Sequence, residues 1–164
     1  MVEPDSMTAF WEARYAQGLV YGTEPTSAGR RLVGVFRAHG VRTVLEAGCG
    51  SGRDALQYAR EGFEATGTEI SENALRWARE RAQAEGLHLT LLRDDLAATN
   101  LPPGSFDAAV AIHLIHLHPA PVRGGEADLV APVADLRRQD VGARLPEHLL
   151  RQAVLEKVPG RKVQ

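Results

Sequence analysis

Three closely spaced glycines mark the part of this 164-residue chain best suited to hold a ligand. Gly48, Gly50 and Gly52 directly follow an apolar run at 43–47, so a ligand can approach a backbone that lacks side chains. The dinucleotide pattern G-x-G-x-x-G needs a third glycine where this chain has Arg53, and the phosphate-loop pattern needs a lysine that is missing. The loop therefore indicates a ligand that lies close to the backbone without the usual phosphate cradle.

Acidic residues are predicted beside this loop, at the ends of the same strand and of the next two. Glu46 precedes the first glycine by two residues, where a carboxylate repels phosphate and attracts a cation. Glu69 follows Gly48 by 21 residues, the interval at which a carboxylate can hold both hydroxyls of a ribose, in NAD or another nucleoside. Asp94 and Asp95 follow the third strand, where an oxygen can accept from an adenine amino group. A cationic nucleoside without phosphate meets these conditions, and S-adenosylmethionine is such a ligand.

These residues must be positioned by strands that end at one edge of a sheet. The periodicity predicts strands at 42–48, 63–70, 87–95 and 106–114, and helices at 51–62 and 71–86. This alternation predicts a Rossmann-like α/β fold, with a parallel sheet and helices on both faces. Ligands of such sheets lie at the carboxyl ends of the strands. For the helix at 71–86 we expect Ser71 as cap, Gly86 as end and an inner stripe of Ala74, Leu75, Ala78 and Ala82.

Two helices are predicted before the first strand. The first covers 6–18, with Ser6 or Thr8 as cap and Gly18 at its end. The second covers 30–40, and the segment between them is a loop rich in turn residues.

The stretches "VLEAGCGSGRDA", "GTEIS", "LLRDDL" and "GSFDAAVAIHLIHLHP" together resemble the cofactor-binding half of a class I S-adenosylmethionine-dependent methyltransferase. The resemblance implies that the glycine loop lies beneath the methionine end, that Glu69 holds the ribose, and that Asp95 contacts adenine with Leu96 on the ring face. It also implies that the segment 111–116 lines the cofactor and faces the methyl acceptor. The cofactor contacts expected on this basis are Glu46, Gly48, Cys49, Gly50, Gly52, Glu69, Ile70, Asp94, Asp95, Leu96 and Ala111.

A narrower resemblance covers the N-terminal segment "FWEARYAQGLVYGTEP", which is similar to methyltransferases of the thiopurine and tellurite-resistance type. The likeness implies a small, soft nucleophile as acceptor, with Trp11 and Tyr15 packing the helix and Tyr21 in a lid near the cofactor. Tyr21 and His116 are the candidates on the acceptor side, and a structural or exposed histidine is the competing interpretation of His116. No general base is assigned, because a thiolate acceptor would not need one.

Other function classes receive little support. The formal net charge of −2 and the lack of a basic block argue against nucleic acid and anionic membranes as partners. No signal peptide or membrane span is predicted, and with Cys49 as the single cysteine a reducing cytoplasm is expected. The histidines of "HLIHLH" lack metal-ligand spacing and acidic neighbours, so no metal site is predicted.

The C-terminal segment differs in composition from the rest of the chain. Residues 121–164 contain no Phe, Trp, Tyr, Ile, Cys or Met. Only four to five of the seven strands of the methyltransferase fold are visible, since Asp128 and Pro132 weaken a fifth strand around "GGEADLVAPV". The prediction is an α/β half at 1–120 and an atypical tail at 121–164, with one or two helices, that does not belong to the ancestral fold.

The favoured function is transfer of a methyl group from S-adenosylmethionine to a small-molecule acceptor. The alternative is a truncated, catalytically incompetent remnant that binds the cofactor weakly or not at all. A nicotinamide-dependent dehydrogenase is disfavoured by Arg53 and Glu46.

Overall fold

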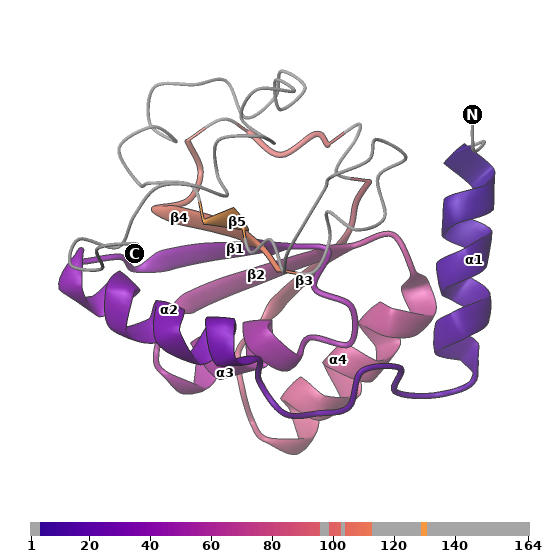
Figure 1. Cartoon of the computed structure of the whole chain (residues 1–164), viewed down its shortest axis with the longest axis horizontal. Coiled ribbons are helices and arrows are strands. Elements are labelled where there is room, and N and C mark those ends of the chain that lie inside the picture. Colours follow the sequence, from indigo (N-terminus) through magenta and orange to yellow (C-terminus); the bar gives the residue numbers. More distant parts are fainter. Residues whose placement is uncertain (1–3, 96–98, 103, 113–128, 131–164) are drawn as a thin grey trace, which may run out of the picture.

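A computed structural model of the chain describes residues 4–95, 99–102, 104–112 and 129–130. Their strands form one sheet in the order β3-β2-β1-β4-β5 (Figure 1). The first four strands are parallel, and β5 pairs antiparallel with β4. The predicted Rossmann-like sheet of four to five strands is confirmed. The strands are β1 (Thr43–Ala47), β2 (Glu64–Glu69), β3 (Thr90–Arg93), β4 (Ala108–Ala111) and β5 (Leu129–Val130).

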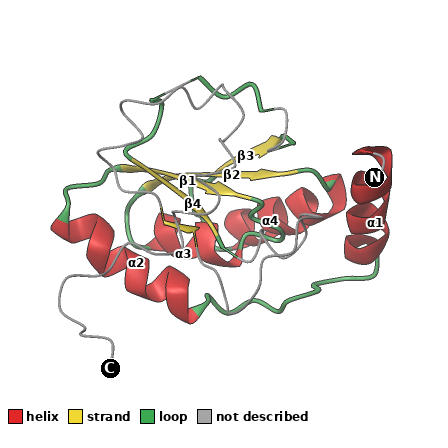
Figure 2. Ribbon diagram, turned by 45° about the horizontal axis from the view of Figure 1, so that its top comes forward, coloured by secondary structure: helices red, strands yellow, loops and turns green. Residues whose placement is uncertain are grey.

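Three helices pack along one face of this sheet, as Figures 1 and 2 show. They are α2 (Ser27–Ala38), α3 (Arg53–Arg60) and α4 (Glu72–Ala84), and α1 (Pro4–Ala16) stands at the side of the molecule beside α4. In the described part of the chain no helix covers the opposite face, so helices on both faces remain a prediction.

The observed helix ends confirm one of the caps predicted from the sequence and correct two others. Ser71 caps α4, with its Oγ accepting from the Ala74 N–H at 3.1 Å, and the predicted inner stripe is buried. The predicted caps of α1 are wrong, because the helix already begins at Pro4 and places Ser6 and Thr8 inside it. Proline suits the first turn of a helix, where its missing N–H costs nothing. Helix α2 also begins earlier than predicted, with Thr26 as its cap.

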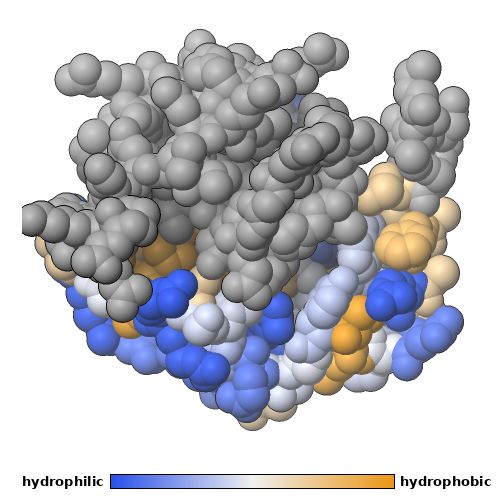
Figure 3. All heavy atoms as spheres, in the orientation of Figure 1, coloured by the Kyte–Doolittle hydropathy of each residue, from blue (hydrophilic) through white to orange (hydrophobic). Residues whose placement is uncertain are grey.

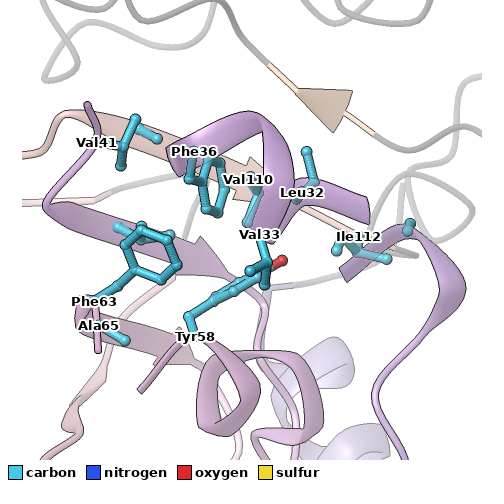
Figure 4. Packing of buried hydrophobic residues seen from close by; sticks show 12 residues of the cluster. Leu32, Val33, Phe36, Val41, Tyr58, Phe63, Ala65, Val110 and Ile112 are labelled. Atoms are coloured by element: carbon cyan, nitrogen blue, oxygen red, sulfur yellow. The ribbon is translucent and has the colours of Figure 1, made fainter. Parts of the chain in front are cut away.

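The main apolar cluster fills the space between the sheet and α2 and α3 (Figure 4). At its centre Phe36 makes edge-to-face contacts with Tyr58 and Phe63, with ring centroids 5.4 and 5.6 Å apart. Side chains of β1, β2 and β4 complete it from the sheet. The cluster comprises Ala28, Leu32, Val33, Phe36, Val41, Val44, Tyr58, Phe63, Ala65, Ala108, Val110 and Ile112.

The fifth strand is short and reverses direction. It consists of Leu129 and Val130, which pair with Ala111 and Val110 of β4. The predicted boundary near residue 120 and the helices predicted beyond residue 130 lie outside the described residues, so the division at 120/121 stays a prediction.

Candidate functional site

The glycine loop turns sharply between β1 and α3. Gly48, Gly50 and Gly52 have φ angles of +66°, +55° and +79°, in the left-handed region that side chains disfavour. The Cys49 N–H donates to the carbonyl of Thr68 at 2.9 Å, which ties the loop to β2. The three glycines thus hold a bare backbone at the carboxyl edge of the sheet. Because β4 lies on the other side of β1 from β2, this edge is also the point where the strand order reverses, the usual ligand position in such sheets.

Glu69 lies directly against this loop. Its Oε2 accepts from the Gly50 N–H and its Oε1 from the Ser71 N–H, both at 3.0 Å. Burial raises the pKa of Glu69, and the hydrogen bonds from Ser71 and Gly50 oppose the shift. The structure therefore joins the predicted ribose residue to the middle of the glycine loop. The Ile70 N–H also donates to this carboxylate, so about one of its roughly four lone-pair sites remains for a ligand.

Glu46 takes a different position from Glu69. Along β1 it projects to the same face as Val44, the face covered by helices, and it is only 4% exposed. One side of the carboxylate accepts from the Ala55 N–H, and Oε2 is buried without a partner among the described residues. Burial, followed by the nearby Asp54 carboxylate, raises the pKa of Glu46 well above its usual value. Glu46 thus lies beneath the loop, at the start of α3.

Cys49 fills a notch in the neighbouring strand. A Cβ on Gly67 would lie 2.7 Å from Cys49 Sγ, so the glycine in the middle of β2 makes room for the thiol. Burial raises the pKa of Cys49, and the charges of Glu46 and Glu69 add to this. The thiol is therefore kept protonated at neutral pH, and the cofactor contact of Cys49 stays a prediction.

The residues predicted to bind adenine follow β3. The Asp94 N–H donates to the Glu69 carbonyl at 3.1 Å, and Asp94 Oδ2 is buried without a partner among the described residues. Asp95 is exposed. The backbone of Asp94 is thus bonded to Glu69, the predicted ribose residue, and the preference for Asp95 as the adenine contact stays a prediction. Leu96 lies outside the described residues.

The other predicted positions are spread over two elements and the undescribed segment. Ile70 follows Glu69 and packs against α1, and Ala111 ends β4, half-buried, at the carboxyl edge. His116 lies outside the described residues.

The segment between α1 and α2 borders the loop. Tyr21 is 51% exposed, and the Arg53 guanidinium lies 5.8 Å from its ring centroid and donates to its carbonyl at 3.2 Å. Tyr15 is buried, and its hydroxyl stands closer than van der Waals contact to the position a Cβ would occupy on Gly50. Sequence reasoning placed Tyr15 in helix packing only. The sequence separation between Tyr15 and Gly50 does not predict that the two residues meet.

Asp54 is a further residue that sequence reasoning missed. It is 1% exposed and accepts from the Thr26 N–H at 2.6 Å and from Thr26 Oγ1 at 2.9 Å. This pair joins the start of α2 to the start of α3. The signal that could have revealed it is the Thr26–Ser27 sequence after Pro25, which is typical of a helix N-terminus.

Comparison with known proteins decides the family. The family model described as a methyltransferase domain matches residues 44–128, more than half of the chain. This chain belongs to the methyltransferase domain family. The prediction of a class I S-adenosylmethionine-dependent methyltransferase is confirmed, and S-adenosylmethionine is the cofactor of that family.

The relatives of this methyltransferase domain are longer than the chain. A putative methyltransferase of Geobacillus sp. (strain WCH70) is 28% identical over 88 residues, covering 54% of this chain and 35% of the relative. The chain thus spans about a third of the length of the curated relatives it matches.

Two solved structures share the fold. One, from work on "Conversion of a Disulfide Bond into a Thioacetal Group during Echinomycin Biosynthesis", is 31% identical with a TM-score of 0.53, over 67% of this chain and 48% of its own. The other is magnesium protoporphyrin IX methyltransferase from Synechocystis PCC 6803 with bound SAM. It is 23% identical with a TM-score of 0.54, and the match covers 70% of this chain and 62% of that protein.

Two kinds of feature are absent from the described ranges of the methyltransferase domain. No described helix has the length and apolar character to cross a membrane. No group of three or more His, Cys, Asp or Glu residues in the same ranges has the geometry of a metal site.

Proposed function

We propose that this methyltransferase domain binds S-adenosylmethionine at the carboxyl edge of the sheet and transfers its methyl group to a small-molecule acceptor. The observation that carries the proposal is the contact of Glu69 with Gly50, which places a ribose-type carboxylate against the glycine loop. Family membership supports the cofactor. The acceptor class rests on the resemblance of the N-terminal segment.

The residues at this edge fit the cofactor in their donor and acceptor chemistry. The Glu69 carboxylate is an acceptor held against the loop and suits a ribose hydroxyl, and the buried oxygen of Asp94 lacks a described partner and suits an adenine amino group. The left-handed glycines leave backbone exposed for the methionine end. Glu46 is nearly fully buried beneath the loop, so we propose that it supports the loop, and its direct contact with the cofactor stays a prediction.

The domain's own contribution to the reaction is alignment. When bound, the cofactor supplies a methyl group on a positively charged sulfur. Gly50 and Glu69 hold the nucleoside in one orientation, and Tyr15 covers the loop from the other side. Tyr21 excludes water from the acceptor side. Positioning of this kind, with reacting atoms about 3 Å apart, supplies most of the acceleration in such a displacement.

A soft nucleophile, such as a sulfur atom, is the proposed acceptor class. The related structure at 31% identity comes from work on a disulfide and a thioacetal, which are sulfur groups. Burial raises the pKa of Tyr15 and of Cys49, so both side chains are protonated at neutral pH and neither is a ready proton acceptor. A thiolate acceptor needs no such base. Tyr21 and His116 remain the proposed acceptor-side residues.

Calorimetry with S-adenosylhomocysteine and with NADH tests the proposal. Binding of S-adenosylhomocysteine that is weakened at least tenfold in Glu69→Ala supports it, whereas Glu64→Ala, an exposed site on the same strand, serves as the control. Binding of NADH alone would reverse the cofactor assignment. Binding of neither ligand by the folded chain would favour the incompetent-remnant alternative.

A further inference from the structure

Helix α1 is held on the molecule by a small set of apolar contacts. It lies beside α4 and away from the sheet (Figures 1 and 2). Its buried residues Trp11 and Tyr15 pack with Ala74 in a cluster separate from the main one, which we call the α1 cluster. On the face drawn in Figure 3, the end formed by α1 carries both hydrophobic and hydrophilic colour. Elements with few buried contacts open locally at low free-energy cost. The polar contacts of α1 therefore contribute much of the free energy that holds this helix in place.

The main polar contact of α1 is Glu12. Its carboxylate accepts from the N–H groups of Glu72 at 2.6 Å and Asn73 at 3.1 Å, the first two helical residues of α4. It also accepts from Ser71 Oγ at 3.3 Å, and Asn73 Nδ2 donates back to the Glu12 carbonyl at 3.1 Å. Although burial acts to raise it, the hydrogen bonds from Glu72 and Asn73 lower the pKa of Glu12. A side chain from another helix thus supplies the acceptors that the start of α4 needs.

Glu12 acts in addition to the ordinary cap of α4, because it serves the N–H groups of Glu72 and Asn73 that the cap leaves free. Ser71 already serves the Ala74 N–H, as the N-cap residue of a helix normally does. What Glu12 adds is a fixed position for α1. A second bond, from Trp77 Nε1 to the Tyr15 carbonyl at 3.1 Å, fixes the same helix one turn further on.

This position of α1 matters at the glycine loop. Tyr15 follows Glu12 by three residues, so both project from adjacent turns of the same helix. The Tyr15 hydroxyl lies over Gly50, the residue whose N–H is held by Glu69. The first turn of α4 begins directly after Glu69 and Ser71, so one short segment carries both the proposed ribose contact and the anchor of α1.

We propose that Glu12 is a positioning residue of the cofactor site: by binding the start of α4, it holds α1 so that Tyr15 closes the glycine loop. The inference rests on the proposed function and adds a residue to it that does not touch the ligand. Its effect on affinity passes through Tyr15.

Calorimetry with S-adenosylhomocysteine on the full chain and four variants tests this role. In Glu12→Gln we expect binding about fivefold to tenfold weaker and tryptophan emission shifted to longer wavelength, since Trp11 and Trp77 lose their shared contact. Glu80→Gln, the same change at an exposed position of α4, is the matched control and should bind within about twofold of wild type. Tyr15→Phe removes only the hydroxyl, and the double variant Glu12→Gln with Tyr15→Phe completes a cycle.

The cycle separates positioning from a merely structural role. If Glu12 acts through Tyr15, Glu12→Gln changes affinity less than about twofold in the Tyr15→Phe background. An equal loss in both backgrounds, or no loss in Glu12→Gln, overturns the inference and leaves the proposed function standing. Global unfolding of Glu12→Gln also overturns it, since releasing α1 should leave the sheet folded. A wild-type chain that does not bind S-adenosylhomocysteine would overturn the proposed function and this inference with it.

Discussion

The main cluster and the α1 cluster differ in what they hold together. The main cluster contains twelve buried residues, which lie on α2, on α3, on three strands and directly beside those strands, and the α1 cluster contains three buried residues. The first joins the sheet to its helices, and the second only seats one helix beside α4. The difference indicates that the domain separates a stable scaffold from a cover that can open, with the glycine loop between them. The predictions below test that separation.

The largest effect is expected in the main cluster. Phe36 is 2% exposed and contacts two other aromatic rings, so Phe36→Ala leaves a cavity that the surroundings cannot fill. The free energy of unfolding, measured with urea, should fall by about 3–5 kcal/mol. Phe10→Ala is the matched control, because Phe10 is 52% exposed, and it should cost less than about 1 kcal/mol. Equal costs at the two positions would contradict the separation.

The contact between β2 and the loop should give the next effect. In Gly67→Ala the new Cβ meets Cys49 Sγ at 2.7 Å and Leu91 Cδ2 at 3.1 Å, so we expect a loss of about 1–3 kcal/mol in urea unfolding. The double variant Gly67→Ala with Cys49→Ala should recover part of the lost free energy of unfolding, because the sulfur that the new Cβ meets is then absent. Gly34→Ala, a helical glycine with open space around it, should be neutral or stabilising by up to about 1 kcal/mol. A Gly67→Ala protein as stable as wild type would contradict this expectation, because the glycine loop would then shift away from β2 at no cost in stability.

Glu46 should make scaffold stability depend on pH. Because its pKa is raised in the folded chain, folding favours the protonated acid, and this contribution is lost as the pH rises through the folded pKa. Glu46→Gln removes that loss, so relative to wild type it should gain on the order of 1 kcal/mol in free energy of unfolding between about pH 5 and about pH 8. Glu64→Gln, exposed on β2, should give no such gain. A difference that is the same at both pH values would show that Glu46 is ionised throughout.

The smallest effect on global unfolding is expected in the α1 cluster. Trp11→Ala removes the ring that contacts Tyr15 and Tyr21, with centroids 6.0 and 6.4 Å away. Hydrogen exchange should become faster throughout α1, while the amides of β1 and α3 keep their protection. The free energy of global unfolding should fall by less than about 1 kcal/mol. Faster exchange in β1 as well would show that cover and scaffold unfold as one unit.

The unit from β1 to α4 was predictable because its signals are local. The glycines, Ser71 and the Ala74–Ala82 stripe of α4 each act on neighbouring residues, and each predicted element is present with shorter ends. The strand predicted at 87–95 shrinks to Thr90–Arg93 because apolar letters alone do not reveal where pairing with β2 stops. The start of α1 was missed for a similar reason, since two hydroxyl residues looked like caps although Pro4 already suited the first turn.

The candidate site was predictable as a set of positions and less so as a geometry. Glu46 and Glu69 both appeared as ligand contacts, yet strand alternation sends Glu46 under α3 and places Glu69 beside Gly50. The contacts of Glu12 with Glu72 and of Asp54 with Thr26 join residues far apart in the chain. No single-sequence periodicity encodes such pairs, because they depend on how the helices are placed against one another.

The notch at Gly67 gives the chain a built-in reporter. Cys49 is the single cysteine, and its sulfur is enclosed between the glycine loop and β2. A thiol reagent reaches this sulfur when the loop lifts from the strand, so the rate of modification reports those openings without any engineered cysteine. A nucleoside bound on the loop should slow the modification in proportion to its occupancy. The modification rate of Cys49 therefore reports ligand binding at this edge of the sheet.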